Sequence, residues 1–436
     1  MTYCELIKLL GFSAFNLQME VIMTESKKHH YVPQSLLRNF KYDKNKILVF
    51  DKKRKVSYPS SIIDAGSENH FNTVVRNGER LNFEALFQKN DDDLACLVEK
   101  IIDNRNTHCL SVLEKEKLLS VIAVQIIRTK MHRTSMKSVS EQLIRQFSEK
   151  EWDLDLEIPT ENDVRELSLS SYKDFKSQME AINGKVGFLI RSNTNEDFII
   201  SDNPITRHNT FPYGGVGLSC HGIEVYFPIS PKLTFALYCP TIIKKMNSYV
   251  VSQPESRTKI LYQSILSGIA SGVPVTLGKT TSRFLNSLQV SNSSRFLYSN
   301  SKDLFCSANE IINKNPDLAE VKTQTTVGEM GKAPINNKMP DGEWVVIHST
   351  HDHHMFPIFN ISNEIGDFKF SIKRNNDIEG VLSSMNIKEI SLFKNGSEIS
   401  HMKDVRLEFS TKDTSELMIK VLHKLDFLNK IIASRK

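Results

Sequence analysis

Two adjacent histidines open the stretch of the chain that is richest in residues able to do chemistry. His29 and His30 precede Tyr31-Val32-Pro33-Gln34, where the proline fixes its own φ and biases the residue before it toward extended backbone. Neighbouring side chains of an extended segment face opposite sides, so one imidazole can enter a site while the other orients it or packs elsewhere. Two interpretations stay open: a catalytic base or metal ligand, and a buried, hydrogen-bonded histidine pair.

The carboxylate of Asp202 is a second candidate. It lies in Ser201-Asp202-Asn203-Pro204, at the end of a predicted strand. Sites are often built at strand ends, and a carboxylate there can hold a divalent metal. An Asx-turn followed by a proline that ends the strand explains the same residues without any chemistry, and both interpretations remain.

Gln125 and Arg128 lie three residues apart on a predicted helix whose face is otherwise apolar, so both head groups point to one side. A buried amide and a buried guanidinium need partners, and a carboxylate such as Asp202 or a bound phosphate would serve. The alternative is an ion pair that ties helix to sheet. Glu84 occupies the first turn of its predicted helix, where compensation of the helix dipole is favoured over a role as a metal ligand.

The densest histidine cluster is His348-Ser349-Thr350-His351-Asp352-His353-His354. On an extended strand, His351 and His353 would share a face and could hold a divalent metal. The spacing matches no zinc motif, and a solvent-exposed polar loop is the favoured interpretation. The sequence has no P-loop, no GxGxxG after a strand, no GxSxG and no HExxH, which argues against ATP hydrolysis and dinucleotide binding.

Composition sets broad limits on the function. The 436 residues are 40% hydrophobic and 25% charged, which is typical of a globular protein. The formal net charge of +5 is compatible with nucleic acid as a partner but does not establish one. Six cysteines without CxxC spacing predict neither disulfides nor a thiolate zinc site, so we expect a cytoplasmic protein. No segment is typical of a signal peptide or a membrane span, and we expect no membrane association.

Hydrophobic periodicity predicts an α+β fold, with a helical N-terminal half packed on a mainly antiparallel sheet. A hairpin is predicted at 46–51 and 55–58, and a second strand pair at 186–190 and 197–200. Further strands are expected at 223–231, 233–238 and 294–299. The predicted helices lie at 82–103, 111–134, 138–150, 161–182, 257–270 and 279–288.

Changes in composition divide the chain into four parts. Residues 1–26 are predicted to be an N-terminal extension, of which 1–22 arise from an upstream extension of the reading frame. Residues 27–310 form the main α+β domain, and 311–342, rich in Lys, Asn, Pro, Thr and Gly, form a linker. Residues 343–436 form a small β-rich C-terminal domain that ends in a helix from Ser415 to about Ser434.

The motifs occur in a recognisable order: His29-His30-Tyr31-Val32-Pro33-Gln34, Gln125-Ile126-Ile127-Arg128-Thr129, Ser201-Asp202-Asn203-Pro204 and Phe227-Pro228-Ile229-Ser230-Pro231. In this order the sequence resembles the bacterial family known as domain of unknown function 4238, over about residues 27–305. The resemblance implies an α+β cytoplasmic bacterial protein with no established activity. The family's motif positions fall on His29, His30, Gln125, Arg128 and Asp202.

Two hypotheses for the function follow. The first is a metal-dependent nuclease or phosphodiesterase acting in defence against phage. In it His29 or His30 activates water, His30, Asp202 and Glu84 hold Mg²⁺ or Mn²⁺, and Arg128 steadies the scissile phosphate, with Gln125 beside it. The second is a binding or sensor module that recognises an anionic small molecule or a partner protein. Geometry discriminates between them, because a nuclease needs one of the histidines within hydrogen-bonding reach of a metal or water that Asp202 also holds.

Overall fold

The computed structural model describes residues 27–149, 159–320 and 342–423, so the predicted N-terminal extension lies outside the described residues. Short gaps within those ranges fall at 173–174, 194–195, 210–215, 221, 279, 350–352, 365–366, 374–381, 383–386, 396, 404 and 412–415. Internal contacts divide the chain into two compact units. The first comprises residues 1–208 and 224–327, and the second comprises 209–223 and 328–436.

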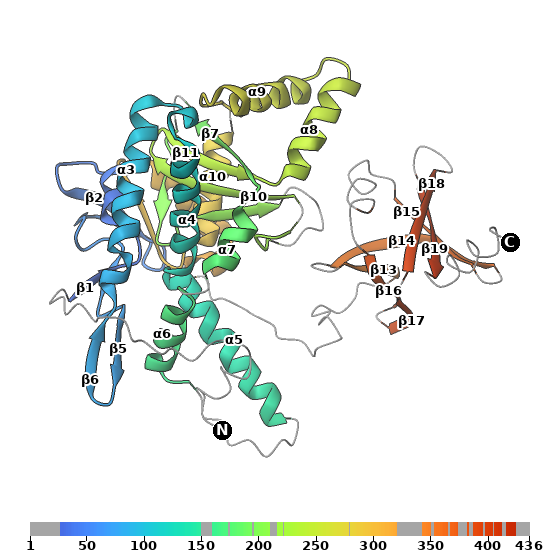
Figure 1. The fold of residues 1–436 in the computed structure, drawn as a ribbon, viewed down its shortest axis with the longest axis horizontal. Coiled ribbons are helices and arrows are strands. Elements are labelled where there is room, and N and C mark those ends of the chain that lie inside the picture. Colours follow the sequence, from blue (N-terminus) through green and yellow to red (C-terminus); the bar gives the residue numbers. More distant parts are fainter. Residues whose placement is uncertain are drawn as a thin grey trace. The chain divides into compact units, whose positions relative to one another are not determined.

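Two four-stranded sheets form the centre of the first unit (Figure 1). One has the strand order β3 (Val56–Ser61), β2 (Lys46–Asp51), β12 (Phe296–Ser299) and β8 (Ile200–Ser201). The other has the order β7 (Val186–Arg191), β11 (Leu233–Tyr238), β10 (Ile223–Ser230) and β9 (Thr206–Asn209). The β2–β3, β2–β12, β8–β12, β7–β11 and β10–β11 pairs are antiparallel. The predicted α+β fold with a mainly antiparallel sheet is therefore confirmed, as is the hairpin β2–β3.

The predicted pairing of 186–190 with 197–200 is wrong. The first segment is β7, which pairs with β11, whereas the second leads into β8 and pairs with β12 in the other sheet. Both segments are short apolar runs that the folded chain buries, and a run of this kind carries no period that identifies its partner.

Helices from all parts of the first unit cover these sheets, and α4 contacts both α3 and α7 (Figure 1). Apart from α2 (Gln34–Arg38), the α-helices described in this unit are α3 (Gln88–Asn104), α4 (Val112–Ile127), α5 (Lys130–Glu149), α6 (Glu161–Ser170), α7 (Phe175–Ile182), α8 (Pro240–Ser252), α9 (Arg257–Ser271), α10 (Thr281–Asn292) and α11 (Leu304–Lys314). Three 3-10 helices join them: η1 (Glu84–Phe87), η2 (Thr107–Cys109) and η3 (Pro316–Ala319). Ser111 begins α4 as predicted, because its hydroxyl accepts the Glu114 N–H and the Glu114 carboxylate accepts the Ser111 N–H.

The helix predicted for 111–134 ends earlier than expected. Helix α4 ends at Ile127, and α5 begins at Lys130 after a break at Arg128 and Thr129. The Thr129 hydroxyl accepts the N–H of His132 at 3.2 Å and so satisfies one of the free amides at the start of α5. The segment predicted as one helix at 161–182 is likewise divided between α6 and α7.

The first part of the predicted linker at 311–342 is helical and packed. Ile311, Ile312, Leu318 and Ala319, from the end of α11 and from η3, join a hydrophobic cluster that also includes Phe50. The prediction is therefore wrong for 311–320, where apolar residues at helical spacing bury one face. Residues 321–341 of the predicted linker lie outside the described part of the chain.

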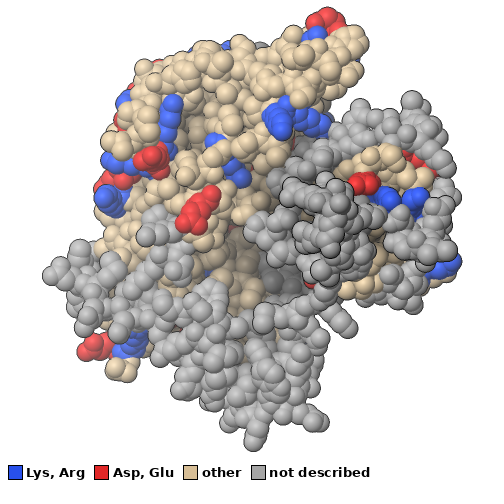
Figure 2. Space-filling model, turned by 45° about the vertical axis from the view of Figure 1, so that its right-hand side comes forward, with Lys and Arg blue, Asp and Glu red and all other residues tan. Residues whose placement is uncertain are grey.

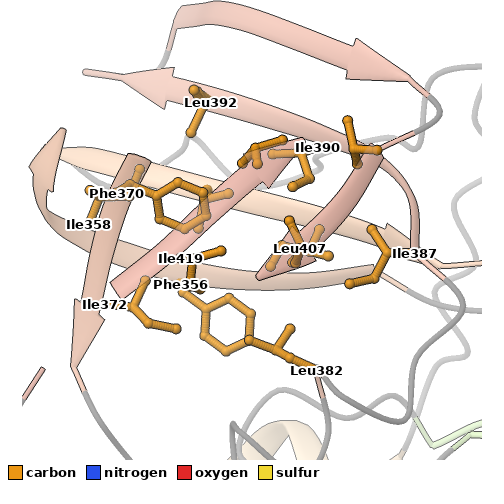
Figure 3. Packing of buried hydrophobic residues seen from close by; sticks show 14 of the residues in the cluster. Phe356, Ile358, Phe370, Ile372, Leu382, Ile387, Ile390, Leu392, Leu407 and Ile419 are labelled. Carbon is orange, nitrogen blue, oxygen red and sulfur yellow. The ribbon is translucent and has the colours of Figure 1, made fainter. Parts of the chain in front are cut away.

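The second unit is a seven-stranded antiparallel sheet. Its strand order is β17 (Ser397–Lys403), β16 (Ile387–Lys394), β13 (Glu343–Ser349), β14 (His353–Glu364), β15 (Asp367–Lys373), β19 (Glu416–His423) and β18 (Val405–Thr411). Buried side chains of these strands, among them Phe356, Phe370, Ile390 and Ile419, meet in one core (Figure 3).

The terminal helix predicted from Ser415 is not found where the chain is described. Residues 416–423 form β19, which pairs with both β15 and β18. Leu417, Ile419 and Val421 alternate with less buried residues, which is the period of a strand, and they bury one face of β19 in the core. The rest of the predicted helix lies outside the described residues. None of the described helices is both long and apolar enough to cross a membrane.

Candidate functional site

The histidine motif forms a short strand and a turn of helix in the first unit. Strand β1 (Lys28–His30) pairs antiparallel with β4 (Ser67–Asn69), which places His29 opposite Glu68. Helix α2 (Gln34–Arg38) begins directly after Pro33. A hairpin of β5 (Thr73–Arg76) and β6 (Glu79–Asn82) follows β4. Both imidazoles are buried, His29 fully and His30 to all but 7% of its surface.

Each imidazole is engaged by the surrounding backbone. The N–H of Asn72 donates to His29 Nδ1 at 2.8 Å, so the proton of this neutral ring is on Nε2. His30 Nε2 lies 3.0 Å from the carbonyl oxygen of Ile63 and donates to it. Burial lowers the pKa of His30, although the nearby Glu84 carboxylate opposes that shift. Both histidines are therefore buried and hydrogen-bonded, and burial favours the neutral form of His30.

Glu84 connects the histidine strand to the loop after β4. Its two carboxylate oxygens accept the His30 N–H at 2.9 Å and the Asn72 side-chain N–H at 2.7 Å. The residue does lie in the first turn of η1, so a contribution to the helix dipole is compatible with its position. Its hydrogen bonds, however, show that it positions β1 against the loop that follows β4.

Gln125 and Arg128 also reach the histidine strand, and both bind its backbone. Gln125 Nε2 donates to the Tyr31 carbonyl at 2.9 Å, and Arg128 Nη2 donates to the His30 carbonyl at 2.6 Å. The carboxylate partner of Arg128 is Asp91 of α3, and the guanidinium stacks over the Phe87 ring at 4.7 Å. The sequence suggested Asp202 or a phosphate as this partner, and the structure places Asp91 there instead.

Asp202 lies apart from this cluster. Its carboxylate accepts the backbone N–H groups of Ser294, Arg295 and Phe296, at 2.7, 2.7 and 2.8 Å. Burial raises the pKa of Asp202, and the three amides and the charge of Lys52 oppose that rise. Within the described part of the chain, Asp202 has no hydrogen bond or ion pair to either histidine. The structure therefore groups His29, His30, Glu84, Gln125 and Arg128, and leaves Asp202 outside the group.

The proposed metal ligands do not fit a metal. Glu84 accepts two N–H groups, His30 Nε2 faces a carbonyl, and Asp202 accepts three amides elsewhere. No group of three or more His, Cys, Asp or Glu residues with suitable geometry exists among the residues that the structure describes. The C-terminal histidine cluster belongs to the β13–β14 hairpin, in which His348 is opposite His353 and His354 is buried beside Phe356. Its residues 350–352 lie outside the described chain.

Asp202 does line a pocket, which we call the α5 pocket. The pocket has a volume of about 340 Å³ and lies between one face of α5 and the segment that begins β12. Charged groups of both signs, three hydroxyl groups and one aromatic ring line it: Lys130, Lys137, Arg295, Glu141, Asp202, Glu320, Thr134, Ser138, Ser294 and Phe296. The volume is at the lower end of the range for small-molecule sites.

The three cations of the α5 pocket differ in how firmly they are held. Arg295 binds Asp51 through Nε and Nη2, at 2.9 and 2.5 Å, and its Nη1 has no hydrogen-bond partner among the described residues. Lys130 pairs with Glu68 and Lys137 with Glu161, and all four of these side chains are at least 38% exposed. Exposed pairs of this kind contribute little to stability, so both ammonium groups can exchange their partner at small cost.

Sequence reasoning missed the residues of α5. Lys130, Thr134, Lys137, Ser138 and Glu141 recur at helical spacing and therefore share one face, a signal that the printed sequence contains. Asn72, Asp91 and Lys52 were missed as well. Their roles depend on backbone groups far away in the chain, and no local pattern identifies those partners.

The histidine cluster and most of the α5 pocket fall within one recognisable region of the chain. A family model described as a protein of unknown function (DUF4238) matches residues 28–303, from the first residue of β1 to just before α11. No curated protein and no solved structure matches the chain. Since the family model matches more than half of the 436 residues, the chain belongs to the DUF4238 family.

Proposed function

We propose that the first unit is a ligand-binding module whose α5 pocket takes a small anionic molecule. The observation that carries the proposal is the convergence of Lys130, Lys137 and Arg295 on one pocket that also offers three hydroxyl groups. Arg295 holds Nη1 ready for an acceptor, because its other two donors are fixed on Asp51. Phosphate and carboxylate groups are the acceptors that such a set of donors suits.

The histidine cluster supports this module as a scaffold. Glu68, which pairs with Lys130 of the pocket, is opposite His29 in the β1–β4 ladder. The bonds of His29, His30, Glu84, Gln125 and Arg128 fix β1 against α4 and the loop before β5. Their function in this proposal is to hold the ladder that presents Glu68 to the pocket.

The same geometry does not favour the metal-dependent nuclease. A nuclease requires a histidine and Asp202 to share a water or a metal, whereas Asp202 is bound to three backbone amides. On the face of the first unit seen in Figure 2, basic and acidic side chains are interspersed and form no continuous basic strip. We expect no cleavage of plasmid DNA or of RNA with Mg²⁺ or Mn²⁺ that depends on His30 and Asp202.

Titration calorimetry with pyrophosphate tests the binding function. We expect pyrophosphate to bind the full chain and Lys130→Ala to weaken binding about fivefold to tenfold, which is the loss of one partly exposed charge-assisted hydrogen bond. The affinity should also fall as salt is added. Lys100→Ala is the matched control, because Lys100 pairs with Glu114 outside the pocket and should bind like the natural protein. Absence of binding by the natural protein, or equal losses in both variants, would refute the proposal.

A further inference from the structure

An aromatic ring lies beside the cations of the α5 pocket. Phe296 lines the pocket and is partly exposed, and the Arg295 guanidinium lies 5.0 Å from the centre of its ring. The backbone of Phe296 is fixed, because its N–H donates to Asp202 and its strand pairs with β2. The backbone therefore fixes the point from which both side chains reach the pocket, with the guanidinium over part of the ring.

Glu141 adds a free acceptor to the same pocket. Its carboxylate has no hydrogen bond or ion pair among the described residues, whereas Asp202 and Glu320 are bound to backbone amides and to Lys53. A ligand that carried only phosphate or carboxylate groups would itself offer no donor to Glu141. A ligand with N–H or O–H groups would satisfy it.

We propose that the anionic ligand is a nucleoside monophosphate. This inference rests on the proposed binding function and adds the chemical class of the ligand. The phosphate binds Lys130, Lys137 and Arg295, the base stacks on Phe296, and Glu141 accepts a hydrogen bond from the sugar or the base. A volume of about 340 Å³ lies within the range of small-molecule sites and is compatible with one nucleotide.

A comparison of three classes of probe separates this inference from the function on which it rests. AMP, GMP, CMP and UMP are titrated into the full chain beside ribose 5-phosphate and pyrophosphate. Stacking of a base on an aromatic ring predicts that at least one nucleotide binds roughly fivefold to a hundredfold more tightly than ribose 5-phosphate. If ribose 5-phosphate binds as tightly as every nucleotide, the nucleoside class is wrong and the anion site stands. If no probe binds, both proposals fail.

Phe296→Leu tests whether the base stacks on the Phe296 ring, because leucine keeps the apolar volume but has no π face. We expect it to remove most of the advantage of the nucleotide and to leave the affinity for ribose 5-phosphate unchanged. Phe284→Leu is the control, since Phe284 is an exposed phenylalanine of α10 that packs against His208 outside the pocket. An unchanged nucleotide affinity in Phe296→Leu would overturn the inference, as would an equal loss in both variants.

Discussion

Lys52 shows how a single charged residue can be buried in this fold. Its side chain is fully buried, and Nζ donates to the carbonyls of Val290 and Ser293, at 2.7 and 2.8 Å. These carbonyls are at the C-terminal end of α10, where the helix leaves acceptors without partners and carries partial negative charge. The ammonium group therefore caps the helix, at the cost of its own hydration.

The lost hydration of the Lys52 ammonium group predicts how the free energy of unfolding depends on pH. Burial lowers the pKa of Lys52 from 10.5 to about 8, with Asp202 opposing the shift. Between these two values the unfolded chain binds more protons than the folded chain, so the free energy of unfolding rises with pH. From about pH 7 to about pH 9.5 the gain from this residue should be about 2 kcal/mol.

Urea unfolding of the natural protein and of Lys52→Met at the two pH values measures this gain. Subtracting the variant removes the contribution of other groups, including the buried tyrosines whose pKa values are raised. The difference in unfolding free energy between the two proteins should shift by about 2 kcal/mol in favour of the natural protein at the higher pH. A difference that does not change with pH would contradict the prediction.

At the scale of elements, Arg128 holds three segments together. It ends α4, binds the His30 carbonyl of β1 and pairs with Asp91 of α3. Its side chain is only 2% exposed, so the planar guanidinium satisfies several partners in a place that water does not reach. Lysine has a single ammonium group and cannot reproduce both the bond to the carbonyl and the paired contact with Asp91.

We expect Arg128→Met to lower the free energy of unfolding by about 2–4 kcal/mol, because the His30 carbonyl and Asp91 both lose their donor. Arg128→Lys should recover only part of that loss. The far-ultraviolet CD signal of helix is the appropriate probe in a urea titration, since every α-helical element with bounds in the described chain belongs to the first unit. Lys100→Met should leave the midpoint nearly unchanged, and a comparable decrease in that variant would contradict a specific role for Arg128.

Local signals in the sequence predicted those elements whose cause is local. Ser111 with Glu114 marks the start of α4, and the alternation around Lys52-Lys53-Arg54 predicts the β2–β3 hairpin. The break at Arg128 was missed because no glycine or proline marks it in the sequence. It arises from bonds to residues 98 and 37 positions away in the chain.

The same distinction applies to the candidate site. His30, Gln125 and Arg128 do lie together. Gln125 and Arg128 are polar residues on an otherwise apolar helix face, and we expected them to need partners for that reason. Asp202 could not be placed, because its partners are backbone N–H groups of residues 294–296, and every residue type except proline offers such a group. The type of a residue identifies the chemistry of its side chain but not the backbone groups that it binds. For Asp202, those partners depend on the register of β8 against β12.

At the scale of the whole molecule, the second unit has a core of its own. Among the described residues of this unit, fifteen buried hydrophobic side chains form it, and they come from within residues 345–421. Trp344 packs with Met355 against a smaller cluster of Val346 and Phe393 in the same unit. A unit with a separate core and its own sheet is expected to fold without the rest of the chain.

Residues 342–436 expressed alone should therefore give a β-type CD spectrum and a single cooperative urea transition followed by Trp344 fluorescence. Within this fragment, Phe370→Ala should lower the free energy of unfolding by about 3–5 kcal/mol, because the ring is fully buried in the main cluster. Lys394→Ala, at an exposed position of β16, should leave it within about 0.5 kcal/mol. A fragment that unfolds without cooperativity would mean that these strands need other parts of the chain, from the first unit or from residues 209–223, to assemble their sheet.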